Sequence, residues 1–182
     1  AEGQWWMFYT VAETGEMDQI AAATSLDGKA WQLLGAVLPP GEVDGWDSLK
    51  VGRPSVLFDN GKFRMWYDGQ PTESAAANNN VAAEVRRAGR AIGYAESSDG
   101  RTWRRRPTPV FHHSAGAIHV TRHQDRYLMV YESSAGVLWA ESLDGVAWDK
   151  RGDLLPITGT DLDKHGHVTP FLQVGESHPA RL

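Results

Sequence analysis

Three stretches of the chain share one pattern, Ala-x-Ser-x-Asp-Gly-x-x-Trp, at residues 23–31, 95–103 and 140–148. The Asp of the second copy follows that of the first by 72 residues, and the third follows the second by 45 residues. Periods near 45 residues are typical of propeller blades and related repeat arrays. The repeat therefore predicts a chain built from similar units, each carrying this motif once.

The chemistry of the motif is that of a hairpin turn. Asp-Gly supplies the positive φ angle that a tight turn between twisted strands requires. The Ser and Asp side chains can bond the turn backbone, and the Trp can pack against the sheet. The motif resembles the Asp-box of sialidases with one residue fewer between Asp and Gly. We expect it to be structural, because turn chemistry accounts for each of its residues.

A second repeated element precedes each motif, at residues 5–10, 63–68 and 127–132. The three segments align on a shared Tyr, and three of the four methionines fall in one column. The alternation has period two, which indicates β-strands. Both faces are largely apolar, as expected for strands covered on both sides by neighbouring blades.

A third element precedes two of these strands, at residues 53–58 and 116–121, and residues 168–172 look like the same element beginning again. The sequence thus predicts an all-β fold, a β-propeller of four-stranded antiparallel blades with about three blades in the chain. We place the blades, within residues 1–182, at 5–40 (without an inner strand), 51–111 and 116–157, with a lone inner strand at 167–174. Residues 71–90 are interpreted as a loop insertion with a short helical turn.

Three blades are too few for a closed ring, which usually has four to eight. Two interpretations remain open. Chains could pair to close a ring, three blades plus three, or the terminal strand could complete the first blade; otherwise the chain is a piece of a longer propeller. Because unpaired strand edges favour pairing with another chain, we expect a homo-oligomer that closes the propeller.

Composition excludes several classes of function. The net charge of −5 argues against a nucleic-acid partner. The absence of cysteine excludes disulfides, thiol catalysis and cysteine-ligated zinc. No apolar run approaches the roughly 18 residues of a membrane span, and no phosphate-binding or dinucleotide fingerprint appears. Eight tryptophans indicate aromatic packing or an aromatic-lined binding surface.

Residues 45–56, 65–69 and 93–100 resemble the five-bladed propeller glycosidase superfamily, which includes glycoside hydrolase families 32, 43 and 62 and the mannoside phosphorylases of family 130. The resemblance implies a carbohydrate partner bound at the propeller funnel, and carboxylates that act as base or nucleophile and as general acid. Families 32 and 43 often carry an Asp before a Pro on an inner strand, and here that position is Arg53. Whether the chain is an enzyme is therefore left open. The alternative is a non-catalytic carbohydrate-binding or a structural, oligomerising propeller module.

Seven residues are candidates for this site. The candidate catalytic carboxylates are Asp47, Asp68 and Glu132. The candidate substrate-binding residues are Trp46, Arg53, His119 and His167. Each also has a simpler interpretation: a capped turn with a packed Trp for residues 46–47, polar strand ends for Asp68 and Glu132, and a local ion pair for Arg53.

The segment from residue 161 to residue 167 alternates ligand-type side chains, namely Asp161, Asp163, His165 and His167. In an extended segment all four would share one face, where carboxylates and imidazoles could bind a divalent metal. A polar loop between blades would have the same pattern, and no metal signature of fixed spacing is matched. We therefore predict no cofactor, with a divalent metal at these four residues as the alternative.

Overall fold

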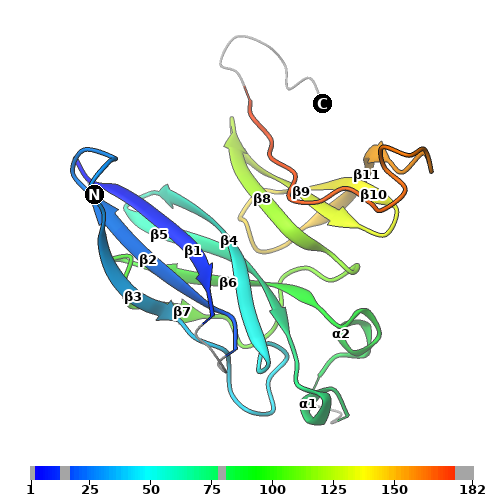
Figure 1. Ribbon diagram of the computed structural model, residues 1–182, viewed down its shortest axis with the longest axis horizontal. Coiled ribbons are helices and arrows are strands. Elements are labelled where there is room, and N and C mark those ends of the chain that lie inside the picture. Colours follow the sequence, from blue (N-terminus) through cyan, green and yellow to red (C-terminus); the bar gives the residue numbers. More distant parts are fainter. Residues whose placement is uncertain (1–2, 13–16, 78–80, 175–182) are drawn as a thin grey trace.

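A computed structural model describes residues 3–12, 17–77 and 81–174 of the protein. Within them, three antiparallel sheets stand side by side (Figure 1), which confirms an all-β partial propeller of about three blades. The first sheet has three strands, and the other two have four. The strands are β1 (Trp5–Val11), β2 (Gln19–Ser25), β3 (Gln32–Leu38), β4 (Lys50–Asp59), β5 (Lys62–Gln70), β6 (Ala91–Ser97), β7 (Arg104–Arg105), β8 (Gly116–His123), β9 (Arg126–Ser133), β10 (Gly136–Ser142) and β11 (Asp149–Pro156).

Two short helices, α1 (Glu73–Ala77) and α2 (Ala83–Ala88), lie between β5 and β6. They occupy the insertion predicted at residues 71–90. No described helix has the length and apolar character needed to cross a membrane.

The repeated motif forms the same hydrogen-bonded turn in all three sheets. In the second sheet, the Ser97 hydroxyl accepts a bond from the Gly100 N–H (2.8 Å) and donates one to Asp99 Oδ1 (2.9 Å). Asp99 Oδ1 also accepts from the N–H groups of Arg101 and Thr102, and these bonds lower the pKa of Asp99 to about 2. Ser25 and Ser142 make the corresponding bonds. The structural interpretation of the motif is confirmed.

The inner strands β4 and β8 carry a bulge at the same position. Their pairing with β5 and β9 shifts register between Gly52 and Ser55 and between Gly116 and His119. The bulge places a non-glycine residue at positive φ in each strand, at Arg53 (47°) and Ala117 (42°). A bulge bends the strand and redirects a side chain, so both inner strands turn at the same depth in the propeller.

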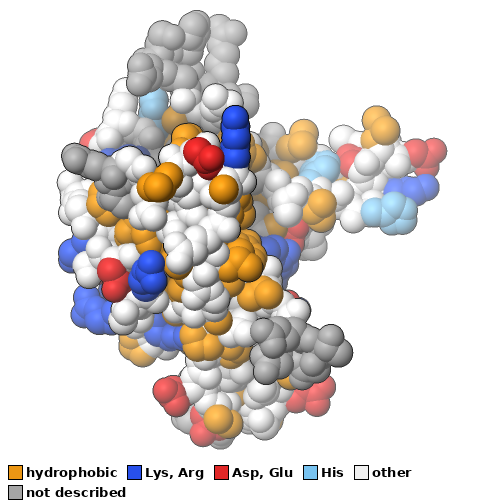
Figure 2. All heavy atoms as spheres, turned by 60° about the vertical axis from the view of Figure 1, so that its left-hand side comes forward, with side chains coloured by type: hydrophobic (Ala, Val, Ile, Leu, Met, Phe, Trp, Pro, Cys, Tyr) orange, Lys and Arg blue, Asp and Glu red, His pale blue; other side chains and the backbone are white. Residues whose placement is uncertain are grey.

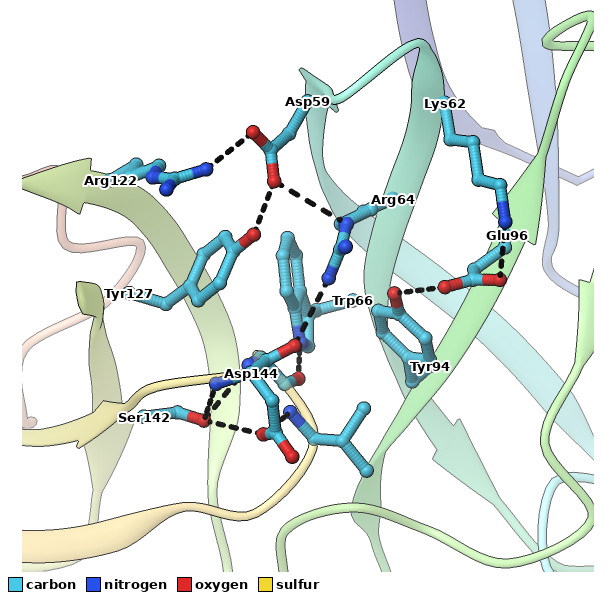
Figure 3. Close-up of polar contacts among 12 residues, drawn as sticks. Asp59, Lys62, Arg64, Trp66, Tyr94, Glu96, Arg122, Tyr127, Ser142 and Asp144 are labelled. Carbon is cyan, nitrogen blue, oxygen red and sulfur yellow. Dashed lines mark hydrogen bonds and ion pairs between the residues drawn. The ribbon is translucent and has the colours of Figure 1, made fainter. Parts of the chain in front are cut away.

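The second and third sheets pack through buried aromatic rings and a polar seam (Figure 3). Trp66 is fully buried, stacks obliquely on Tyr127, and donates its Nε1–H to the Gly145 carbonyl at 2.7 Å. At the end of β4, Asp59 accepts a bond from the Tyr127 hydroxyl and pairs with Arg122 and with Arg64 (3.5 Å). These contacts bind the sheets to each other away from the bulges.

The strand predicted at 167–174 is not formed. The backbone runs beside β8 without strand pairing. It is held there by a hydrogen bond from the Leu172 N–H to His119 Nδ1 (3.1 Å) and by ring contact between Phe171 and His119. A strand requires a partner strand, and none of the described residues supplies one on its far side.

Candidate functional site

Arg53 joins two acidic side chains from neighbouring sheets. Its guanidinium forms an ion pair with Asp68 at the end of β5, and its Nη1 lies 3.2 Å from Glu132 Oε1 at the end of β9. Arg90 approaches the same oxygen of Glu132 at 2.9 Å and donates its Nε–H to the Ser114 carbonyl at 3.1 Å. The structure thus brings together three residues that the sequence only proposed separately.

The repeat itself places these side chains. Thr10, Asp68 and Glu132 occupy the same position in β1, β5 and β9, one residue after the shared Tyr. Thr10 Oγ1 accepts the N–H of the bulge residue Arg53 at 2.7 Å, and Asp68 Oδ2 accepts the N–H of the bulge residue Ala117 at 3.3 Å. The end of each second strand therefore contacts the bulge of the next inner strand. This position both supports the fold and faces the cluster around Arg53.

Asp68 is the most perturbed carboxyl group of the cluster. Burial raises its pKa to about 6, although Arg53 and the N–H of Ala117 both favour the charged form. Its residue exposure is 5%, and its Oδ1 is buried without a hydrogen-bond partner. Buried polar atoms rarely lack a partner unless a ligand or water completes the site. Asp68 could therefore accept a bond at Oδ1, or carry a proton at mildly acidic pH.

A hollow of about 320 Å³ opens beside Arg53 and Asp68. Its wall includes Thr10, Lys50 and Gln70, whose side chains can all bond hydroxyl groups. The volume is within the roughly 300–1,000 Å³ of small-molecule sites. Gly52 keeps the wall open, because a Cβ there would lie 2.9 Å from Thr10 Oγ1. The remaining lining residues are Asp18 and Val51.

Trp46 and Asp47 lie outside this cluster and are buried, with exposures of 6% and 3%. Trp46 stacks on Tyr67, with ring centroids 5.9 Å apart. Asp47 Oδ2 accepts bonds from the Tyr67 hydroxyl (2.9 Å) and from Arg105 (2.8 Å). Burial closes the indole face to a sugar ring, and the carboxylate is already paired. Both residues make packing contacts, in agreement with the simpler interpretation of residues 46–47.

The two histidines are also apart from the Arg53 cluster. His119 packs against Phe171, its Nδ1 accepts the Leu172 N–H, and burial lowers its pKa, which favours the neutral ring. His167 lies 3.9 Å from Asp163 through Nε2, while its Nδ1 is buried without a partner. Neither histidine lines the hollow beside Arg53.

The four alternating residues proposed for a metal do not converge. Residues 161–165 form a turn and not an extended segment, so their side chains do not share a face. Asp161 pairs with Lys164, and Asp163 accepts bonds from Thr158 and Thr160 that lower its pKa to about 2. In the part of the chain that the structure describes, no three His, Asp or Glu side chains are grouped to hold a metal.

Arg90 is a member of the cluster that the sequence did not reveal. It lies at the end of the insertion after β5, immediately before β6, where the repeats do not align. A second hollow of about 510 Å³ adjoins it through Ser114, with Arg87, His112 and His113 in its wall. The one available signal was position, because the insertion joins two strands of the same blade.

Comparison with solved structures places this geometry in a known architecture. A glycoside hydrolase superposes with a TM-score of 0.70 at 23% identity over 90% of this chain and 53% of its own. A family 117 glycoside hydrolase produced by the marine bacterium Zobellia galactanivorans gives 0.64 at 15% over 82% and 43%. An exo-1,5-α-L-arabinanase from a bovine ruminal metagenomic library gives 0.60 at 15% over 85% and 52%.

The fold is that of the propeller glycoside hydrolases. This confirms, for the fold, the resemblance read from the repeat. The chain spans about half the length of the first of these structures. No known family matches the chain by sequence, and no curated protein is detectably similar to it.

Proposed function

We propose that the chain binds carbohydrate at the cluster of Arg53, Asp68, Glu132 and Arg90. The observation that carries the proposal is the buried, partnerless Oδ1 of Asp68 beside a hollow of about 320 Å³. A sugar hydroxyl could donate to this oxygen, while the guanidinium of Arg53, 41% exposed, could donate to a ring or hydroxyl oxygen. Glycoside hydrolases among the solved neighbours support carbohydrate as the ligand class.

A second candidate function is acid–base catalysis on a glycosidic bond. Glycoside hydrolysis uses one protonated and one ionised carboxyl group on either side of the bond. The raised pKa of Asp68, about 6, suits a proton donor, and Glu132 is held by two arginines as a carboxylate would be. The pair would act together with groups contributed from outside the described residues. Turnover of aryl glycosides would support this function.

Binding can be tested by titration with a panel of oligosaccharides that includes 1,5-arabino-oligosaccharides and fructo-oligosaccharides. We expect Arg53→Ala and Asp68→Asn to weaken binding by about tenfold or more, because each removes a charge-assisted bond worth about 1.5–3 kcal/mol. Asp59→Asn is the matched control. Asp59 is also a carboxylate paired with arginines, but it lies at the opposite end of β4.

Equal losses in Asp59→Asn and Asp68→Asn would mean that the effect comes from weakened sheet contacts and not from a binding site. The absence of binding to every sugar in the panel by the folded unmodified chain would contradict the proposal.

A further inference from the structure

Strand β1 presents an unprotected edge. It is the terminal strand of the first sheet, which has the order β1-β2-β3. Its seven residues carry no charge, and Trp5 and Met7 are exposed by 62% and 42%. Figure 2, which turns this side of the molecule forward, shows hydrophobic side chains gathered on the surface. Edges of this kind usually carry Lys, Pro or a bulge that prevents pairing with another strand. β1 has none of these.

Residues 168–172 have the conformation of an inner strand. Thr169 has a φ of 49°, and it aligns with the bulge residues Arg53 (47°) and Ala117 (42°) of β4 and β8. Pro170 follows Thr169 as Pro54 follows Arg53. The segment therefore continues the series of inner strands in its local backbone.

One hydrogen bond repeats along this series. The Val120 N–H of β8 donates to Ser55 Oγ of β4 at 2.9 Å. The Leu172 N–H donates to His119 Nδ1 of β8 at 3.1 Å. Leu172 aligns with Val120, and His119 aligns with Ser55. Residues 168–172 thus sit against β8 as β8 sits against β4.

The two features are complementary but apart. The first sheet has no inner strand among the described residues, and residues 168–172 have the inner-strand position but no sheet of their own. In Figure 1 the segment lies beside β8, across the molecule from β1. Val168 and Phe171 are 72% and 76% exposed, so an apolar surface remains on this side too.

We propose that residues 167–174 of one copy pair with β1 of a second copy, and that the exchange is reciprocal. Each first sheet would then gain the inner strand that it lacks. Two copies would form a ring of about six blades, within the four to eight of closed propellers. Neither strand carries a Lys, Arg, Asp or Glu side chain, so no charge opposes their pairing.

The repeat also predicts the register of this pairing. In the existing sheets, Val56 lies opposite Met65 and Val120 lies opposite Met129. Leu172 aligns with the two valines, and Met7 aligns with the two methionines. Leu172 of one copy should therefore lie opposite Met7 of the other, with antiparallel strands and side chains on the same face.

Cysteine cross-linking tests this register directly, because the chain has no native cysteine. The variant Met7→Cys with Leu172→Cys should form a disulfide-linked dimer on mild oxidation, since opposite residues bring their Cβ atoms within about 4.5–5.5 Å. The matched control is Met7→Cys with Phe171→Cys. Its two side chains would point to opposite faces and should cross-link at least about tenfold less.

Solution mass by light scattering completes the test. We expect a mass of two chains for the unmodified protein, and of one chain for Phe171→Asp. Leu162→Asp, which alters another exposed apolar residue (98%), should keep the mass of two. A single-chain mass at about 100 μM would overturn the proposal. A two-chain mass with equal or no cross-linking in the two cysteine variants would overturn it as well, because the copies would then associate through another surface or a preceding segment would be required. Sugar binding is measured separately, so failure of either proposal leaves the other standing.

Discussion

Arg53 combines a backbone and a side-chain role at one position. Its positive φ of 47° belongs to the bulge, and its amide is held by Thr10. Its guanidinium then reaches two carboxylates from different sheets. The sequence predicted Arg53, Asp68 and Glu132 as candidates because the repeat aligns their strands. It did not predict that they meet, because the bulge that redirects Arg53 depends on pairing and not on local pattern.

The raised pKa of Asp68 predicts a pH dependence of stability. Because burial favours the protonated form in the folded chain, this group stabilises the fold fully below about pH 4 and less as pH rises through about 6. Asp68→Asn removes this titration. We expect the unmodified chain to lose up to about 3 kcal/mol of unfolding free energy relative to Asp68→Asn between pH 4 and pH 7. Urea unfolding at a series of pH values measures the difference, and a difference that stays constant with pH would contradict the assignment.

Thr10→Val tests the same position in the first sheet. The change keeps the side-chain shape but removes the acceptor of the Arg53 N–H. Because water can reach the half-exposed bulge, we expect a loss of about 0.5–1.5 kcal/mol in unfolding free energy. Thermal unfolding would show it. Thr121→Val, on a partly buried strand position of β8 without such a bond to a bulge, is the control.

At the scale of elements, local chemistry was predictable where it is self-contained. The Ser-x-Asp-Gly turns follow from the sequence because each bond lies within a few residues. The segment from 161 to 167 was harder to predict. Alternating polar residues suit both an extended strand and a turn, and the bonds of Asp163 to Thr158 and Thr160 favour the turn. Arg90 was missed since the insertion has no repeat partner.

The three turns should differ in their contribution to stability. The third turn also accepts bonds from the second sheet, since Trp66 donates to the Gly145 carbonyl and Arg64 donates to the Asp144 carbonyl. The first turn contacts only the exposed ring of Trp5 among the residues near Gly28. We expect Ser142→Ala to cost about 2–3 kcal/mol and Ser25→Ala about 1 kcal/mol. Equal costs in thermal unfolding would mean that the turns act independently of sheet packing.

For the whole molecule, the period of the repeat was sufficient to predict the fold. Each blade buries its apolar faces only against a neighbour, so a repeat of this length with alternating aromatic strands implies a stacked array. Whether the array closes is a different question. Closure depends on the free edge of β1 and on the segment at 168–172, and neither is decided by contacts within one chain.

Strand exchange between copies should make stability depend on protein concentration. A folded dimer in equilibrium with unfolded chains gains stability by mass action, whereas a folded monomer does not. We expect the melting temperature of the unmodified chain to rise by about 3–6 °C between 5 and 500 μM, for a chain of about this size. Phe171→Asp should melt at one temperature over the same range, because the charge would be buried against the apolar edge of β1 in the exchanged dimer but stays in water in the monomer, where Phe171 is 76% exposed. A melting temperature of the unmodified chain that does not change with concentration would show that the first sheet is stable with its edge open, and the inner-strand conformation of residues 168–172 would then be set by β8 alone.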